Sequence, residues 1–228
     1  MGKQRYKVII TGSNSGSKIA WSFINILLND NHIKPIFINP NSTIIPKSFD
    51  GLIITGGSDI NPKLYNQKRH PSIKKLEPNR DKLELTLLDR AYKNNLPIFG
   101  ICRGMQLINI FLGGDLIQHI HDLNLKYPHS NSILPLKKIK ILKNTKLYKI
   151  VNKSSLYVNS IHHQAVNRLG KGLRVNAYDR NKIVEGIESK DNRFLLGVQW
   201  HPEYMIYKKD SRKLFYSFKK AVLKQKWF

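Results

Sequence analysis

Short apolar runs alternate with stretches of helical periodicity along the first half of the chain, and this alternation restricts the possible folds strongly. The apolar runs, rich in Ile, Val and Phe, span 6–12, 33–40, 49–57 and 96–101. The stretches with apolar residues at helical spacing span 17–30, 80–95 and 103–114. Strands that are apolar throughout and separated by helices predict a parallel sheet covered by helices on both faces.

The second half of the chain is richer in β patterns. Strand-like segments span 155–166, 173–179, 183–189 and 194–203, and a helical pattern follows at 211–225. Residues 114–154 have little regular pattern, so we expect loops and an inserted excursion there. The fold class predicted is α/β: an open, mostly parallel sheet flanked by helices, with a more β-rich second half. We expect residues 1–228 to form one domain.

The 228-residue chain contains one cysteine, which excludes an internal disulfide framework and a Cys-rich metal site. No apolar stretch approaches the roughly 18 residues that a membrane span needs. The first residues lack the apolar core and cleavage site of a secretory signal. We therefore expect a cytoplasmic protein with no membrane partner.

The formal charge is +24, from 39 Lys and Arg against 15 Asp and Glu. One interpretation is an anionic partner such as nucleic acid. The other is compositional drift, because Lys, Asn and Ile are abundant together. The lysines are scattered and no aromatic-basic binding motif accompanies them. We therefore do not expect nucleic acid to be a partner.

The single cysteine, Cys102, lies in "FGICRG", between an apolar strand pattern and a helical one. A strand, a tight turn and a helix are the layout of a nucleophile elbow. The helix N-terminus would favour the thiolate. Free cysteines are also common core residues, so this stretch alone does not decide whether Cys102 is a buried core residue or a nucleophile.

A thiol nucleophile needs a base, and the base needs a group that orients it. "VQWHPE" supplies His201 and Glu203, which point to the same side of an extended segment. The alternative is a surface turn. The position of the segment after an apolar strand favours a site, because sites form at the carboxyl ends of parallel strands.

The strand that ends in "IITGG" presents backbone N–H groups at the same edge of the sheet. The N–H groups of Gly57 and Arg103 are the candidate pair for an oxyanion hole. The alternative is an ordinary turn that ends a strand.

Together these segments resemble the class I glutamine amidotransferase-like superfamily. "GICRGMQ" and "VQWHPE" resemble its nucleophile and His-Glu motifs. "GGSDINPKLY" resembles the glycine motif of one branch, the peptidase C26 hydrolases of the γ-glutamyl-γ-aminobutyrate hydrolase type. Further matches in the same order are "RDKLE", "LGGDLIQ", "NSIHHQAV" and "IVEGIES".

The resemblance implies that Cys102 is the nucleophile, His201 the base and Glu203 the carboxylate of a hydrolase. It implies a γ-glutamyl thioester intermediate and no metal or organic cofactor. It also implies substrate-binding roles for Gln106, Ser160, His162, His163, Gln164, Asp59 and Tyr65.

Some of these roles have alternatives. Gln106 could be a solvated helix residue, and Asp59 the cap of a short helix. The pair His162–His163 suggests a metal but lacks a third ligand in register. Three further residues lie in "RDKLE", which resembles the start of a helix in the family. They could form structural salt bridges or contact the substrate: Arg80, Asp81 and Glu84. Three other histidines are expected in a lid or on the surface: His119, His121 and His129.

Three functions are compatible with this pattern. The first is a γ-glutamyl hydrolase that acts on a small γ-glutamyl amine and is compatible with a homo-oligomer. The second is a glutaminase subunit that supplies ammonia to a separate synthase. The third is a basic, non-enzymatic binding protein on the same scaffold, since a fold alone does not fix function. We rank them in this order.

Overall fold

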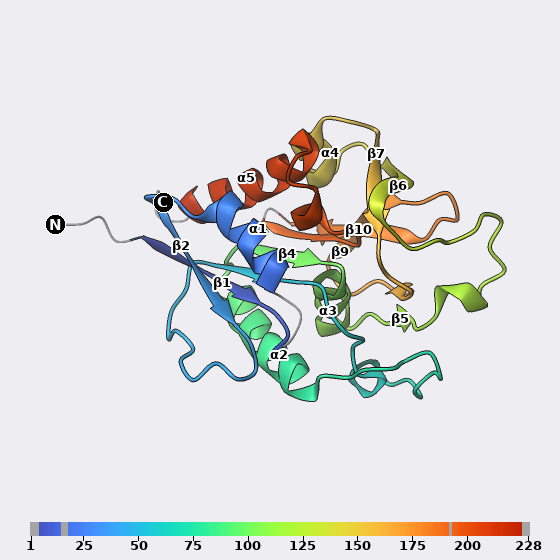
Figure 1. Cartoon of the computed structure of the whole chain (residues 1–228), viewed down its shortest axis with the longest axis horizontal. Helices are drawn as coiled ribbons and strands as arrows, with labels where there is room; N and C mark the ends of the chain where they lie inside the picture. The colour runs from blue at the N-terminus through green and yellow to red at the C-terminus, as the bar shows by residue number, and fades with distance from the viewer. Residues whose placement is uncertain (1–4, 15–17, 192, 225–228) are drawn as a thin grey trace.

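The protein is described here from a computed structural model that places residues 5–14, 18–191 and 193–224 (Figure 1). The first residue of the expected helix at 17–30 and the last residue of the one at 211–225 lie outside the described residues, as does the start of the segment tested for a secretory signal. Within them, no helix combines the length and apolar character needed to cross a bilayer.

Nine strands of the described chain form one sheet in the order β2-β1-β3-β4-β11-β10-β9-β6-β7. Five neighbouring strands are parallel: β2 (Ile33–Ile38), β1 (Tyr6–Thr11), β3 (Gly51–Ile54), β4 (Ile98–Ile101) and β11 (Leu195–Val198). Four antiparallel strands extend the sheet: β10 (Val184–Ser189), β9 (Leu173–Tyr178), β6 (Ser132–Ile141) and β7 (Ser155–Ser160). A separate pair consists of β5 (Leu116–Ile117) and β8 (Ala165–Val166).

Helices cover both faces of the sheet (Figure 1). One face carries α1 (Lys18–Leu28), α4 (Lys146–Val151) and α5 (Lys209–Lys224). The other carries α2 (Pro78–Lys93) and α3 (Arg103–Phe111). Short 3-10 helices are η1 (Pro62–Tyr65), η2 (Ile120–Asp122) and η3 (Pro202–Met205).

The apolar pattern of the strands explains why helices pack on both faces of the sheet. In β1, Val8 and Ile10 belong to the apolar cluster under α1 and α5, while Ile9 belongs to the cluster under α2 and α3. Because alternate side chains point to opposite faces, a strand covered on both sides is apolar throughout. The predicted fold class, an α/β sheet flanked by helices with a β-rich second half, is confirmed.

The expectation for 114–154 is wrong in part. The region contains loops, but also the ten-residue strand β6 and the helix α4. Pro135 and the bulge between Ser132 and Lys137 interrupt β6, and Ile133 and Leu134 are exposed. A strand with an internal proline and apolar residues on its solvent side has no clear two-residue period, which hid it.

Parallel pairing brings the carboxyl ends of β1, β3, β4 and β11 to one edge of the sheet. The segments that follow Ile54, Ile101 and Val198 contain the glycine pair, the cysteine and the His-Glu pair. All three candidate site segments therefore begin at the same edge.

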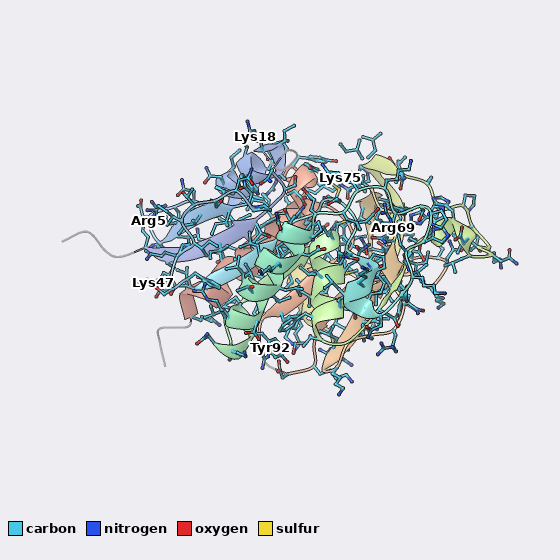
Figure 2. The ribbon with its side chains drawn as sticks, turned by 90° about the horizontal axis from the view of Figure 1, so that it is seen from below. Arg5, Lys18, Lys47, Arg69, Lys75 and Tyr92 are labelled. Atoms are coloured by element: carbon cyan, nitrogen blue, oxygen red, sulfur yellow. The ribbon has the colours of Figure 1, made fainter. Side chains whose placement is uncertain are left out.

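Basic side chains are spread over the molecule. Figure 2 shows Arg5, Lys18, Lys47, Arg69 and Lys75 at separate places along its length. These labelled residues do not form one continuous basic stripe.

Candidate active site

Cys102 occupies a strained turn between β4 and α3. Its backbone has φ 51° and ψ −106°, and it is the residue directly before the helix. A non-glycine residue with positive φ costs free energy and needs support from its surroundings. That support includes a hydrogen bond from the Cys102 N–H to the Val198 carbonyl, at 2.7 Å. A Cβ on Gly104 would come closer than 3.0 Å to the carbonyl oxygen of Ile54, so only glycine lets α3 approach β3 this closely.

His201 lies between Glu203 and Cys102. Its Nδ1 is 2.8 Å from Oε1 of Glu203, and Cys102 lies near enough for its charge to act on the imidazole. Burial alone would lower the pKa of His201, but the opposing charges of Glu203 and Cys102 outweigh burial and raise that pKa well above its ordinary value. The arrangement favours the protonated form of the imidazole beside Cys102.

Two neighbours fix the position of His201. Asn159 accepts a hydrogen bond from the His201 N–H at 2.8 Å and donates one to the His201 carbonyl at 3.0 Å. Tyr204 stacks on the imidazole with ring centroids 5.3 Å apart. The ring also passes so close to Gly56 that a Cβ there would come within 3.0 Å of Cε1. Glycine at position 56 therefore makes room for the imidazole.

The peptide between Gly56 and Gly57 is held by Arg80. One guanidinium nitrogen of Arg80 donates to the carbonyls of Thr55 and Gly56, at 3.1 and 2.9 Å. Because a trans peptide points its N–H opposite to its carbonyl, the Gly57 N–H faces away from Arg80. The other candidate oxyanion donor, Arg103 N–H, is in the first turn of α3, where N–H groups have no partner within the helix.

The side chains of Arg80 and Arg103 meet at one buried carboxylate, Glu84. Arg80 Nε donates to Glu84 Oε1 at 2.8 Å, and Arg103 pairs with Glu84 and with Asp81. Thr11 donates to Glu84 at 2.6 Å. Burial alone would raise the pKa of Glu84, but the two guanidinium charges lower it. Of the two roles left open for the residues at 80–84, the structure shows salt bridging.

Gln106 points to the interior of the site. Its side-chain nitrogen donates to the Gln164 carbonyl at 3.2 Å and to Oε1 of Gln199 at 3.1 Å. Gln199 in turn donates to Sγ of Cys102 at 3.4 Å. Gln106 is buried, so the alternative of a solvated helix residue is wrong. Gln199 was not predicted as a site residue, although it stands in the same "VQWHPE" segment as the His-Glu pair.

His163 and Asp59 connect two of the predicted substrate segments. Nε2 of His163 is 2.8 Å from Oδ1 of Asp59, and its Nδ1 is 3.4 Å from Nδ1 of His119. Asp59 does not cap the short helix η1, because Asn61 does. In the described residues, no group of three or more His, Cys, Asp or Glu side chains is placed to hold a metal ion.

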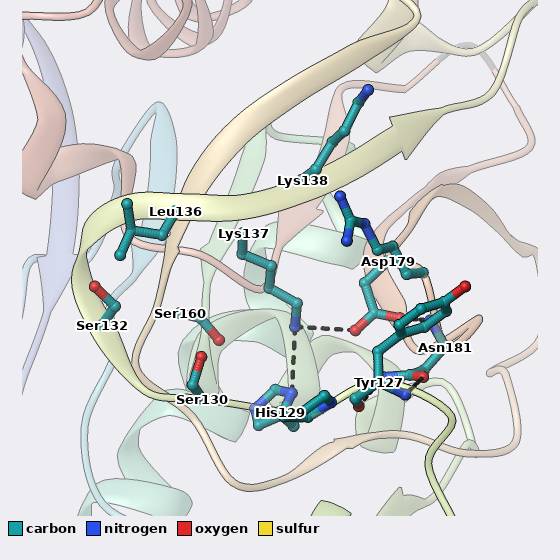
Figure 3. A pocket seen from close by; sticks show the side chains of 12 residues that line it. Tyr127, His129, Ser130, Ser132, Leu136, Lys137, Lys138, Ser160, Asp179 and Asn181 are labelled. Atoms are coloured by element: carbon teal, nitrogen blue, oxygen red, sulfur yellow. Dashed lines mark hydrogen bonds and ion pairs between the residues drawn. The ribbon is translucent and has the colours of Figure 1, made fainter.

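Ser160 lines a cavity of about 230 Å³, and His162 is buried close to this cavity, within hydrogen-bond range of Lys137. Neighbouring residues of a strand point to opposite sides, so Asn159 reaches His201 while Ser160 lines this cavity. The Ser160 hydroxyl is buried and has no hydrogen-bond partner among the residues that the structure describes. Figure 3 shows the ammonium group of Lys137 between Asp179 and His129 in the same cavity.

Two neutral histidines surround Lys137. His129 Nε2 donates to the His162 carbonyl at 2.9 Å, and Nδ1 of His129 is 3.4 Å from the Lys137 ammonium. His162 Nδ1 donates to the Gln164 carbonyl at 2.9 Å, and its Nε2 is 3.5 Å from the same ammonium. Burial and the charge of Lys137 lower the pKa of both histidines. Of the two places expected for His129, a lid or the surface, the surface is wrong, because the residue is buried.

Glu185 is the buried partner of Lys137. Burial raises the pKa of Glu185 to about 7, even though Lys137 opposes that change. Tyr65, for which the resemblance implies a substrate-binding role, packs in the apolar cluster under α2 and α3, and burial raises its pKa. The structure thus places Tyr65 in the core.

Comparison with known proteins shows to which family the chain belongs. Residues 35–203 match the family model described as Peptidase C26. The chain belongs to the peptidase C26 family. The Enterococcus hirae protein NtpR is 38% identical over 181 residues, covering 75% of this chain and 74% of that protein. A glutamine amidotransferase structure from Thermotoga maritima has the same fold, with a TM-score of 0.64, 12% identity and coverage of 97% and 98%.

One relative is named for an enzymatic activity, and this name indicates the general type of reaction. The Escherichia coli K12 protein named gamma-glutamyl-gamma-aminobutyrate hydrolase PuuD is 30% identical over 173 residues, covering 71% of this chain and 66% of that protein. Membership of a peptidase family with such a relative indicates that this peptidase C26 protein is a hydrolase.

Proposed function

We propose that this protein hydrolyses the amide bond of a γ-glutamyl amine through a thioester on Cys102. The observation that carries the proposal is the arrangement of Glu203, His201 and Cys102 at the turn where β4 enters α3. Glu203 contacts the imidazole of His201, and the charge of Cys102 raises the pKa of the same ring. A paired imidazolium and thiolate is the form of a Cys-His site that is ready to attack a carbonyl.

In the proposed reaction, the Cys102 sulfur attacks the amide carbonyl and forms a C–S bond. The negative charge on the carbonyl oxygen is stabilised by the N–H groups of Gly57 and Arg103. The tetrahedral intermediate collapses, the C–N bond breaks, and the proton on His201 passes to the departing amine. Neutral His201 then takes a proton from water, hydroxide attacks the thioester, and glutamate leaves with the thiolate restored.

The γ-glutamyl specificity rests on the one reported relative that is named for a γ-glutamyl activity, and on the residues around the sulfur. His163 and Asp59 form one side of the candidate glutamyl site, and the backbone of Gln164 is anchored by Gln106.

The alternative is a glutaminase subunit that delivers ammonia to a separate synthase. The candidate triad is compatible with both reactions, so substrate preference and the need for a partner distinguish them. An isolated glutaminase subunit would act on free glutamine and would be stimulated by its synthase.

The test is a panel of γ-glutamyl amides and free glutamine, with release of glutamate measured for the purified chain. We expect turnover of one or more γ-glutamyl amines, and a loss of at least about a thousandfold in Cys102→Ala. Preference for free glutamine would favour the alternative. Unchanged turnover in Cys102→Ala would reject the mechanism.

A further inference from the structure

Gln199 contacts the sulfur of Cys102 from the interior of the protein. Its side-chain nitrogen lies 3.4 Å from Sγ, and the residue has no exposed surface. It follows β11, and its backbone N–H donates to the Glu185 carbonyl at 2.8 Å. The side chain is thus anchored at its base and has little freedom to turn away.

The orientation of the Gln199 amide follows from a chain of contacts that starts at a backbone carbonyl. The Gln164 carbonyl can only accept, so the end of Gln106 that faces it must be the nitrogen. That nitrogen also faces Gln199 at 3.1 Å, so the nearer atom of Gln199 must be its oxygen. The opposite end of the amide, which faces Cys102, is therefore the N–H donor.

An N–H donor aimed at sulfur stabilises a thiolate more than a thiol, because hydrogen bonds to charged groups are stronger. The contact also fixes the direction of the sulfur, since Gln199 is held at both ends. We infer that Gln199 is a positioning residue that donates a hydrogen bond to the Cys102 thiolate, and that Gln106 acts by orienting Gln199. Both amide hydrogens of Gln106 are directed to protein groups, which assigns it a supporting role.

This inference extends the proposed function but is tested on the thiol itself. The rate at which iodoacetamide alkylates Cys102, measured against pH, reports how readily the thiolate forms, with no substrate present. The titratable groups that face the sulfur are His201 and Tyr204, with Glu203 behind His201. All three are retained in the variants used.

Gln199→Met removes the donor and keeps an unbranched side chain of similar length. We expect the midpoint of the alkylation profile to rise by about one pH unit, and the rate below that midpoint to fall about tenfold. The matched control is Gln118→Met, which removes an amide whose side-chain hydrogen bonds within the described residues go to Gln67, Lys68 and His70 and not to the sulfur. Its profile should equal that of the unchanged protein.

A folded Gln199→Met variant with an unchanged midpoint would overturn the inference. If Gln199→Met does not fold, the unchanged protein supplies the test by NMR. The side-chain amide resonances of Gln199 should shift with pH at the alkylation midpoint, and this response should disappear in Cys102→Ala. Side-chain amide resonances of Gln199 that do not shift with pH at this midpoint would also contradict the inference. Neither outcome depends on whether a γ-glutamyl amine is the substrate.

Discussion

Asn159 holds the backbone of His201 by two hydrogen bonds, accepting from its N–H at 2.8 Å and donating to its carbonyl at 3.0 Å. The residue that carries the candidate base is therefore fixed by the end of β7, while Glu203 fixes the ring. The imidazole reaches Cys102 only because two distant segments of the chain meet here.

Replacing Asn159 should impair activity more than folding. In Asn159→Ala, the backbone of His201 loses both partners and the imidazole can move by a fraction of an ångström. We expect kcat to fall by roughly 10- to 100-fold, because catalysis depends steeply on alignment. Steady-state kinetics on the best substrate of the panel checks this, with Asn94→Ala at the end of α2 as the control. Equal activity of the two variants would contradict the role given to Asn159.

Substitution of Gly56 should mainly reduce activity, whereas substitution of Gly104 should mainly reduce stability. In Gly56→Ala the new Cβ meets the imidazole of His201, a side chain that can shift, so activity should fall with little loss of stability. In Gly104→Ala the new Cβ meets the backbone carbonyl of Ile54, which cannot shift without moving β3. We expect that variant to lose about 1–3 kcal/mol of unfolding free energy. Urea unfolding and activity assays on both variants test this, and a stability loss of the same size in both would argue against it.

The buried carboxylate of Glu84 should be essential for stability. Glu84→Gln leaves two buried guanidinium groups, those of Arg80 and Arg103, without their shared partner. We expect a loss of roughly 3–5 kcal/mol in unfolding free energy. The matched control lies on the same helix: Asp89→Asn removes an exposed pair with Lys93 and should cost less than about 0.5 kcal/mol. Similar unfolding curves for both variants would show that the buried cluster is not stabilising.

Glu185 should make stability depend on pH. Its pKa rises from 4.5 to about 7 in the folded protein because it is buried, so the folded state keeps this proton over that range. Its contribution to stability is therefore largest below about pH 4.5 and is lost as pH rises toward 7. In Glu185→Gln this loss is absent. The difference between the unfolding free energies at pH 5 and pH 8 should therefore be smaller in the variant than in the unchanged protein. An equal difference in both proteins would contradict the raised pKa of Glu185.

The fold and the first layer of the candidate site could be predicted because both depend on local patterns. The strand ending at Ile101, the cysteine and the following helix are consecutive in sequence, and His201 and Glu203 are two residues apart. Parallel pairing then brings these segments to one edge. The chemistry of each segment is visible in its own residues.

The supporting residues could not be predicted, since their partners are distant in the chain. Asn159 contacts a residue 42 positions away, and Gln199 contacts Cys102 across 97 positions. Their local patterns are those of ordinary strand ends. Lys137 was hidden for a similar reason, because its strand β6 carries an internal proline and a bulge.

The most direct measurement of the central claim is the mass of the peptide that contains Cys102 after rapid acid quenching during turnover of a γ-glutamyl amine. We expect this peptide to carry the mass of one γ-glutamyl group, and the added mass to disappear in Cys102→Ala together with release of glutamate. Glutamate released at an undiminished rate by Cys102→Ala, with no modified peptide in the unchanged protein, would contradict the account.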